Sequence, residues 1–482
     1  MRSYFPETTI GFLQVPIELV PLDMHNQDEL NYTLKGLQEI YKNKALCMAT
    51  LNLIKKDMPS NPDEAKGTKG LSLWEIFVLA VVRRSGKIDY RKLADLASNH
   101  LSLIGILGHG SVEGQLYSHS TLQDNIVLVQ AKTLDTINIM IVKHAQTYCE
   151  KSLEKVRVDS FVFESNIHFH ADYKSLVDGA RCMLREGARL ADLIGFDGFR
   201  QWRYLTKKIK NLGYKIVQIN KSKKATKDDD LFIGYTEILD AMEQIYEKMF
   251  SLLDAACKFN IKSLSEPKQI RFEKLLSKVY FFFSGTAVEH ELAKRRVILG
   301  ETIGAKEKIF SLFEPHAEMI CKGKVKVRME FGHAVIVAQC NNGFMLTGDR
   351  IESGLKDADI CIPFIKELQE KYDNKIKCMT FDKGFHNPKN KKEIKVLVPE
   401  ALLLAKGRTP IEEKDDAYYD KKHWHAGVES SINALEQGNN MGVCRDKGLP
   451  GFDRSVKASI LARNIHRLGL ILFEQSRQKL TA

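Results

Sequence analysis

Apolar residues recur at helical spacing through the first part of the chain. In "LSLWEIFVLAVVRRSGKIDYRKLADLASNHLSLIGILG" (71–108) they lie three or four positions apart, Gly86 interrupts the pattern, and a second amphipathic segment starts near Tyr90. The polar stretch 55–70 before it is expected to be a loop. A longer helix is expected at about 120–150, opening at "HSTLQDN", where a Ser or Thr caps the first turn. The helix pair around the glycine is either a helix-turn-helix or an ordinary packed pair.

The pattern changes at "RVDSFVFESNIH" (157–168), where Val and Phe predict a strand. Asp159 lies in the middle of this strand. Carboxylates are depleted in strand interiors and are costly to bury unless they are paired or bind a metal. We therefore expect Asp159 to be paired with a charged group or to bind a metal. From about 176 to 300 the spacing is helical again.

After residue 300, short β-rich runs alternate with helical ones. The segment 323–351 predicts an antiparallel hairpin that turns at Asn341-Asn342-Gly343. Further strands are expected at 375–382 and 394–406, and helices at about 355–372 and 417–437. A hairpin followed by α/β alternation favours one mixed sheet with helices on its faces, and thus an α/β fold.

The composition is that of a folded protein with a moderate positive charge. Among 482 residues, 44% are apolar and 28% charged, and 72 basic residues face 61 acidic ones, giving a net charge of +11. This excess allows a polyanionic partner without requiring one. The nine cysteines form no Cys-x-x-Cys pair, which argues against a structural zinc site and favours reduced thiols in the cytoplasm. No signal peptide is evident and the longest apolar runs are too short to span a bilayer, so we expect a soluble protein.

The basic residues gather in one segment, 207–227, which holds eight lysines. Lys221, Lys223 and Lys224 stand close together near its end. Such a run is either a solvated face or a strip that follows the phosphates of DNA.

Three acids on separate elements are candidates for one site. Asp159 lies in a strand, Asp382 closes the strand 375–382, and Glu429 lies on the helix 417–437 with His425 one turn before it. Two hard cations held by carboxylates can catalyse in-line phosphoryl transfer, which would also compensate the buried charge. The alternatives are that the second acid only starts a turn and that the third faces solvent.

A second possible metal site is less complete. His168, His170 and Asp172 alternate in "NIHFHAD", but no fourth ligand is evident nearby, so zinc is not expected there.

Three segments resemble the DDE transposases of bacterial insertion sequences, closest to the group of elements kept outside the main named families. They are "VDSFVFESNIHFHADYKSLVDGARCM" (158–183), "FDKGFHNPKN" (381–390) and "HAGVESSINALEQGNNMGVCRDKGLPGFDRSVKASILARNIHRLG" (425–469). The segment 71–108 and "SHSTLQDN" also resemble the N-terminal helical domain and joining helix of such proteins. The similarity covers most of 70–470, in the same order.

The resemblance implies an RNase H-like mixed sheet flanked by helices, interrupted by a helical insertion and preceded by an all-helical N-terminal domain. The expected parts are a DNA-binding domain (1–115), a connecting helix (116–150), a catalytic domain (151–175 and 301–475) and the insertion (176–300).

The resemblance also implies the chemistry. Asp159, Asp382 and Glu429 match the three acids of the family, and they would bind Mg²⁺ or Mn²⁺ as a pair of ions. The implied activity is cleavage of the element's ends and joining of the freed 3′-hydroxyl to target DNA. The implied partners are double-stranded DNA and a second copy of the chain, because an element has two ends. The expected location is the cytoplasm, at the nucleoid when DNA is bound.

The sequence departs from the family at positions around the third acid. Many relatives have Tyr, Arg and Lys where this chain has Lys422, His425 and Glu436. Lys422 and His425 could supply part of the phosphate binding expected there. The alternative from another class is a catalytically silent or host-adopted DNA-binding protein, and a structure-selective nuclease is a third possibility.

Overall fold

The chain forms two compact units. The computed structural model describes residues 2–6, 15–23, 28–59, 70–110, 116–321, 329–405 and 415–481. One unit comprises Met1–Asn166 and Ile320–Ala482, and the other is Ile167–Met319. The predicted boundaries near 115 and 150 both fall inside the first unit, and the predicted insertion falls inside the second.

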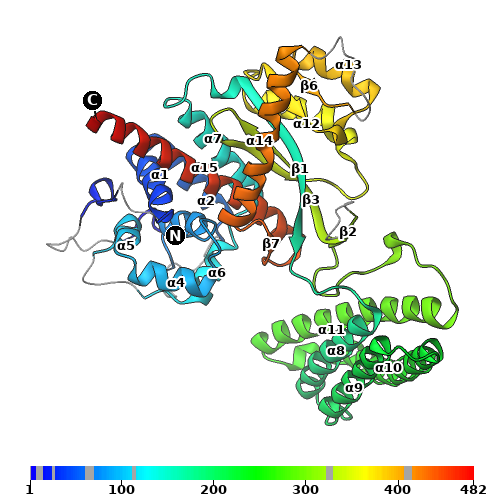
Figure 1. The fold of residues 1–482 in the computed structure, drawn as a ribbon. Coiled ribbons are helices and arrows are strands. Elements are labelled where there is room, and N and C mark those ends of the chain that lie inside the picture. Colours follow the sequence, from blue (N-terminus) through cyan, green and yellow to red (C-terminus); the bar gives the residue numbers. More distant parts are fainter. Residues whose placement is uncertain are drawn as a thin grey trace. The chain divides into compact units, whose positions relative to one another are not determined.

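Helices make up the first part of the first unit (Figure 1). They are α1 (Leu30–Lys42), α2 (Lys44–Asp57), α3 (Leu73–Val82), α4 (Tyr90–Asn99), α5 (Leu101–Leu107), α6 (His119–Ile126) and α7 (Ala131–Ala145). Ser72 and Glu75 form a capping box at the start of α3. Every residue of α3 is buried, with Trp74 at the centre of the core. Gly86 has a φ of 119°, as the predicted break requires.

The single helix predicted at about 120–150 is wrong. The segment forms α6 and α7, which meet at an angle of 81°. Ser118 caps α6 by accepting a hydrogen bond from the Thr121 amide, so the helix starts close to the predicted position but its cap is the serine just before "HSTLQDN". The bend lets α6 pack on α3 and α4 while α7 packs on α2 and the sheet.

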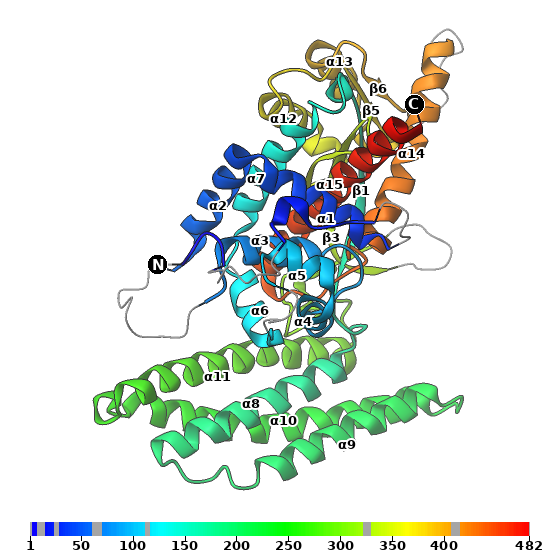
Figure 2. The ribbon, with the colours of Figure 1, turned by 90° about the vertical axis from the view of Figure 1, so that its left-hand side faces the viewer.

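The C-terminal helix α15 (Gly448–Thr481) lies along α1 in both Figure 1 and Figure 2. Glycines allow the two backbones to approach. A Cβ at Gly36 would lie 2.1 Å from the Ile465 carbonyl oxygen, and one at Gly469 would lie 1.8 Å from that of Tyr32. This crossing joins the N-terminal helices and the sheet into one packed body.

The sheet has the order β2-β3-β1-β5-β6, with β4 also paired to β3 and β7 to β1. Its strands are β1 (Lys155–Ser165), β2 (Glu318–Ile320), β3 (Glu330–Cys340), β4 (Met345–Arg350), β5 (Cys378–Phe381), β6 (Leu402–Leu403) and β7 (Val443–Cys444). β1 is antiparallel to β3 and parallel to β5. The prediction of a mixed α/β sheet flanked by helices is confirmed.

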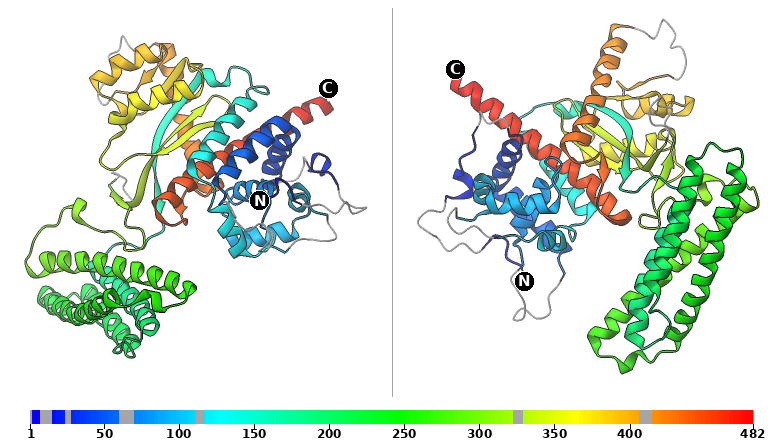
Figure 3. Two further views of the ribbon diagram at one scale, coloured as in Figure 1. Left: turned by 180° about the vertical axis from the view of Figure 1, so that it is seen from behind. Right: turned by 60° about the horizontal axis from the view of Figure 1, so that its bottom comes forward.

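Side chains of β1 alternate between two cores. Val156 and Val158 pack with α7, α12 (Asp357–Lys371), α13 (Pro388–Leu397) and the end of α15. Phe161 and Phe163 pack on the other face with α14 (Asp416–Gly438) and the start of α15. In Figure 1, α14 lies across β1, and the left view of Figure 3 brings the opposite face forward. Asp159 alternates with Val158 and so belongs to the α14 face.

The structure confirms the predicted hairpin but not the last predicted strand. β3 and β4 pair antiparallel around a turn in which Gly343 has a φ of 85°, which confirms the hairpin, although 323–328 lies outside the described residues. The strand predicted at 394–406 is wrong, because α13 runs to Leu397 and only β6 remains. Asn387 caps α13 and Pro388 takes its first position, and these start signals outweigh the β-branched residues that follow.

The second unit is built from four long helices that run side by side (Figures 2 and 3). They are α8 (Asp172–Ile194), α9 (Trp202–Lys221), α10 (Lys227–Lys258) and α11 (Glu266–Ala293), which continues into a π-helical turn at Lys294–Ile298. A Cβ at Gly179 on α8 would lie 2.0 Å from Thr286 Oγ1 on α11, so these two helices are in close contact.

Within the described ranges, no individual helix has both the length and the apolar character needed to cross a bilayer. Only the bent pair α6 and α7 reaches that level when the two are taken together.

Candidate functional site

Two of the predicted acids occupy neighbouring positions on adjacent parallel strands. Val158 on β1 pairs with Phe381 on β5, and Asp159 and Asp382 are the next residues of the two chains. Asp382 keeps an extended backbone, with φ −71° and ψ 169°, before the 3-10 turn Lys383–Phe385. Because paired strands lie about 4.8 Å apart, the two carboxylates emerge side by side.

The third acid comes from α14, and Arg157 fixes that helix on the sheet. The Arg157 guanidinium donates from Nε to Gln339 Oε1 at 2.7 Å, from Nη1 to the Trp424 carbonyl at 3.0 Å and from Nη2 to Ser431 Oγ at 3.2 Å. Ser431 Oγ in turn donates to Gln339 Oε1 at 2.6 Å. Gly427 makes room for this arginine, since a Cβ there would lie 2.1 Å from Nη1. These contacts hold one stretch of α14 against β1 and β3.

His425 links α14 to β5. Its Nδ1 lies 3.0 Å from Thr380 Oγ1, and the ring is buried. Burial holds the pKa of His425 below its ordinary value, and the Arg157 charge acts in the same direction. The charges of Asp382 and Glu429 oppose this shift.

Glu429 lies on α14, which packs against β1 and β5. The helix runs along β1, because Arg157 contacts it near Trp424 while Leu435, farther on, packs with Phe161. From His425 to Glu429 the helix rises about 6 Å. From Thr380 to Asp382 the strand rises about 6.6 Å. The register of β1 against β5 thus sets Asp159 beside Asp382, and α14, which packs on both strands, carries Glu429. The three carboxylates are not among the described groups whose ligand atoms all lie within 4.8 Å of one another.

The donor set fits hard divalent cations. Asp382 and Glu429 are exposed. Asp159 Oδ1 accepts a hydrogen bond from the Ser160 amide at 2.7 Å. Carboxylate oxygens open to solvent are the ligands that Mg²⁺ and Mn²⁺ take, with water completing the coordination.

The predicted DNA-contacting residues divide into exposed and buried ones. Lys422 is exposed on α14, and Lys221, Lys223 and Lys224 are exposed at the end of α9 and in the turn after it. His425 was predicted to contact phosphate. Its burial against Thr380 does not present the ring to a DNA backbone, so its place in the site is that of a positioning residue.

Sequence reasoning missed Arg157, Gln339 and Ser431. Arg157 alternates with Asp159 in the strand, and an arginine on the buried face of a strand is as unusual as the acid. The presence of both Arg157 and Asp159 in one strand was the sign that the sequence offered. The partners on β3 and α14 are distant in sequence, and nothing local identifies them.

No protein-family model, curated protein or solved structure gives a significant match to this chain.

Proposed function

We propose that this protein is a DNA transposase of the DDE type, with an RNase H-like catalytic domain, which cuts the ends of a mobile element and joins them to target DNA. The observation that supports the proposal is the β1–β5 register, which sets Asp159 beside Asp382, with Glu429 on the helix that packs against both strands. Each acid stands on a different element, and two of the elements are central strands. Such a site is held rigidly enough for metal-assisted phosphoryl transfer.

In this proposal the three carboxylates hold two Mg²⁺ or Mn²⁺ ions. When bound, the ions activate the attacking oxygen and stabilise the leaving one during in-line displacement. The residues of the chain itself contribute by positioning the three carboxylates. The β1–β5 register sets the two aspartates, while Arg157 and His425 set the helix that bears Glu429. Both strand cleavage and strand joining are phosphodiester displacements, so the same site serves both.

Binding of DNA would rest on exposed cations. The chain carries a net charge of +11, and Lys422 stands on α14 seven positions before Glu429. Lys221, Lys223 and Lys224 offer a second basic surface on the helical unit. Each lysine that contacts a phosphate releases counterions and strengthens binding at low salt. Two ends of one element call for two copies of the chain.

The decisive experiment compares Asp382→Asn with the wild type on DNA that carries the inverted repeats flanking the gene. With Mg²⁺ the wild type should nick this DNA, and the variant should bind it with similar affinity without cutting. Asp420→Asn, an exposed acid on α14 outside the site, is the matched control and should cut normally. Cleavage by Asp382→Asn at the wild-type rate contradicts the proposal.

The same experiment separates the other candidates. Binding without nicking by the wild type supports a catalytically silent DNA-binding protein. Cleavage that ignores the repeat sequence supports a structure-selective nuclease.

A further inference from the structure

Three metal-ligating side chains meet inside the helical unit, apart from the three acids. They are His170, which precedes α8, Asp172, the first residue of α8, and Glu289, near the end of α11. One ligand atom from each lies within 4.8 Å of the other two. The close packing of α8 and α11 at Gly179 and Thr286 brings these two helices together.

Glu289 is the unusual member of this cluster. It is only 2% exposed, and within the described residues its Oε1 has no hydrogen-bond partner. Burial raises the pKa of Glu289 to about 7, and the nearby Asp172 adds to the shift. A buried carboxylate oxygen without a partner is unfavourable unless a cation compensates it. His170 also has an unpartnered ring nitrogen, Nδ1, buried beside it.

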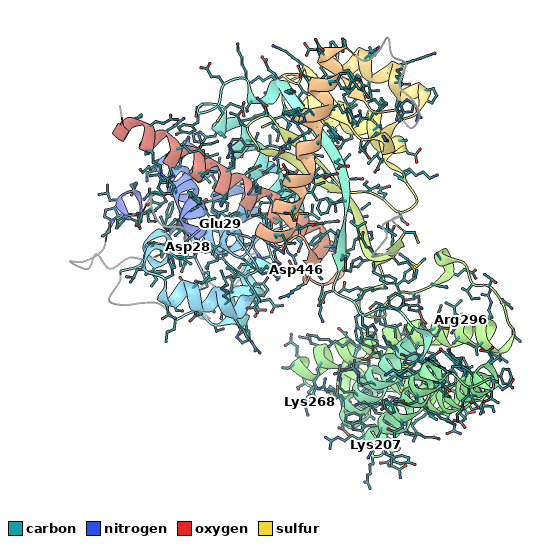
Figure 4. The ribbon with its side chains drawn as sticks, in the orientation of Figure 1. Asp28, Glu29, Lys207, Lys268, Arg296 and Asp446 are labelled. Carbon is teal, nitrogen blue, oxygen red and sulfur yellow. The ribbon has the colours of Figure 1, made fainter. Side chains whose placement is uncertain are left out.

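Asp172 is oriented by an arginine from the other side. The Arg296 Nε donates to Asp172 Oδ2 at 2.5 Å, and Asp172 Oδ1 lies 3.4 Å from His170 Nε2. Asp172 Oδ2 therefore pairs with Arg296, and Oδ1 faces His170. Figure 4 marks Arg296 in the turn that follows α11. An outer partner of this kind fixes a ligand's orientation, as in many metal sites.

An open pocket of about 480 Å³ adjoins the cluster within the same unit. His170 and Asp172 form part of its wall, together with Tyr235, Arg296 and Lys308. The pocket gives an ion a path of entry and leaves room for water in the remaining coordination positions.

We propose that His170, Asp172 and Glu289 bind a first-row divalent cation, with Zn²⁺ the best match. One imidazole and two carboxylates form a donor set that Zn²⁺ accepts, whereas Mg²⁺ prefers oxygen ligands alone. Glu289 is the ligand missing from the sequence pattern, 117 positions beyond Asp172. The ion joins the start of α8 to the end of α11 and so closes the helical unit where its chain enters and leaves. This site is independent of the proposed transposase activity.

The test is a titration of the full-length protein with Co²⁺, whose visible bands are intense in a four-coordinate protein site and weak in the octahedral aqua ion, followed by displacement with Zn²⁺. The Asp382→Asn variant serves as the parent, so that the all-carboxylate site contributes less. We expect one equivalent of Co²⁺ with intense bands, and a loss of affinity of at least about tenfold in Glu289→Gln. Glu273→Gln, an exposed acid on the same helix, should bind like the parent.

Thermal unfolding supplies a readout that does not depend on the spectrum. In chelator, Glu289→Gln should unfold at the same temperature as the parent or higher, because it removes a buried carboxylate with one unpartnered oxygen. Zn²⁺ should raise the unfolding temperature of the parent above its value in chelator, and it should not raise that of the variant. Equal Co²⁺ binding by parent and Glu289→Gln, or no bound ion in the parent, overturns the proposal. If Glu289→Gln fails to fold, Asp172→Asn takes its place with the same expected loss.

Discussion

The contact between Gly427 and Arg157 allows a sharp test of how α14 is held on the sheet. In Gly427→Ala the new methyl group would lie 2.1 Å from Arg157 Nη1, so the guanidinium must move. The movement breaks its hydrogen bond to the Trp424 carbonyl, now 3.0 Å long. In an Arg157→Ala background there is no guanidinium to displace, and the three atoms nearest to the new methyl group are absent.

The two backgrounds should therefore give effects of opposite sign. Loss of a hydrogen bond from a charged group costs about 1.5–3 kcal/mol. Replacing Gly by Ala within a helix stabilises by about 0.5–1 kcal/mol. With Arg157 present, Gly427→Ala should destabilise the protein by about 1–2 kcal/mol, and without it the substitution should stabilise by up to about 1 kcal/mol.

The assay is urea unfolding of the four proteins in this double-mutant cycle, followed by far-UV circular dichroism. Gly438→Ala is the control, because it lies on the same helix and a Cβ there has no neighbour within 4 Å. Its effect should be small and the same in both backgrounds. An equal effect of Gly427→Ala in the two backgrounds would refute the assigned role of Arg157.

The same substitution bears on the proposed activity. Displacing α14 by about 1 Å moves Glu429 relative to the two aspartates, and such a shift can lower the rate by about 100-fold. Cleavage by Gly427→Ala should fall by this order while DNA binding stays near wild type. Unchanged cleavage would mean that the position of Glu429 does not limit the reaction.

Two further predictions concern charge. Replacing Lys221, Lys223 and Lys224 together by Gln should weaken DNA binding and reduce the salt dependence of the binding constant by up to about 2.7 log units per log unit of salt, at about 0.9 per lost contact. Filter binding at a series of salt concentrations measures this dependence. An unchanged slope would mean that the three lysines lie on a solvated face and do not contact DNA. Asp446 is the buried partner of Arg83 and Arg84, at 2.5 and 2.8 Å, so Asp446→Asn should destabilise the protein by about 3–5 kcal/mol at neutral pH. Burial alone would raise the pKa of Asp446, but the two arginines hold it well below its ordinary value. The stability it supplies is therefore present above about pH 4 and lost as the pH falls further, so the gap between variant and wild type should narrow in acid. A gap that widens in acid contradicts this pairing.

The element that carries each acid could be predicted from the sequence. The strand around Asp159, the strand before Asp382 and the helix bearing Glu429 all form near their predicted positions, because periodicity and capping are local properties. The register of β1 against β5 could not be predicted, since parallel pairing depends on contacts between residues more than 200 positions apart. It is this register that sets the two aspartates side by side.

Other features could not be predicted from the sequence, for related reasons. In the segment after Asn387, local helix-start signals and β-branched residues pointed to different structures, and the cap prevailed. Glu289 gave no sign of its role, because an acid in a helical pattern is ordinary until its neighbours are known. The burial of His425 likewise depends on how α14 meets β5.

The position of the helical unit has a consequence for how the chain folds. β1 ends just before the unit and β3 begins just after it, yet the two strands are antiparallel neighbours, with Glu164 opposite Gly332. Pairing them directly from the extended chain would require closing a very long loop, and high contact order slows folding. Early collapse of α8–α11, whose contacts are more local, shortens that loop before the strands meet. The central ladder is thus expected to form late, and a chain with 167–319 replaced by a short turn should acquire its sheet faster than the natural one.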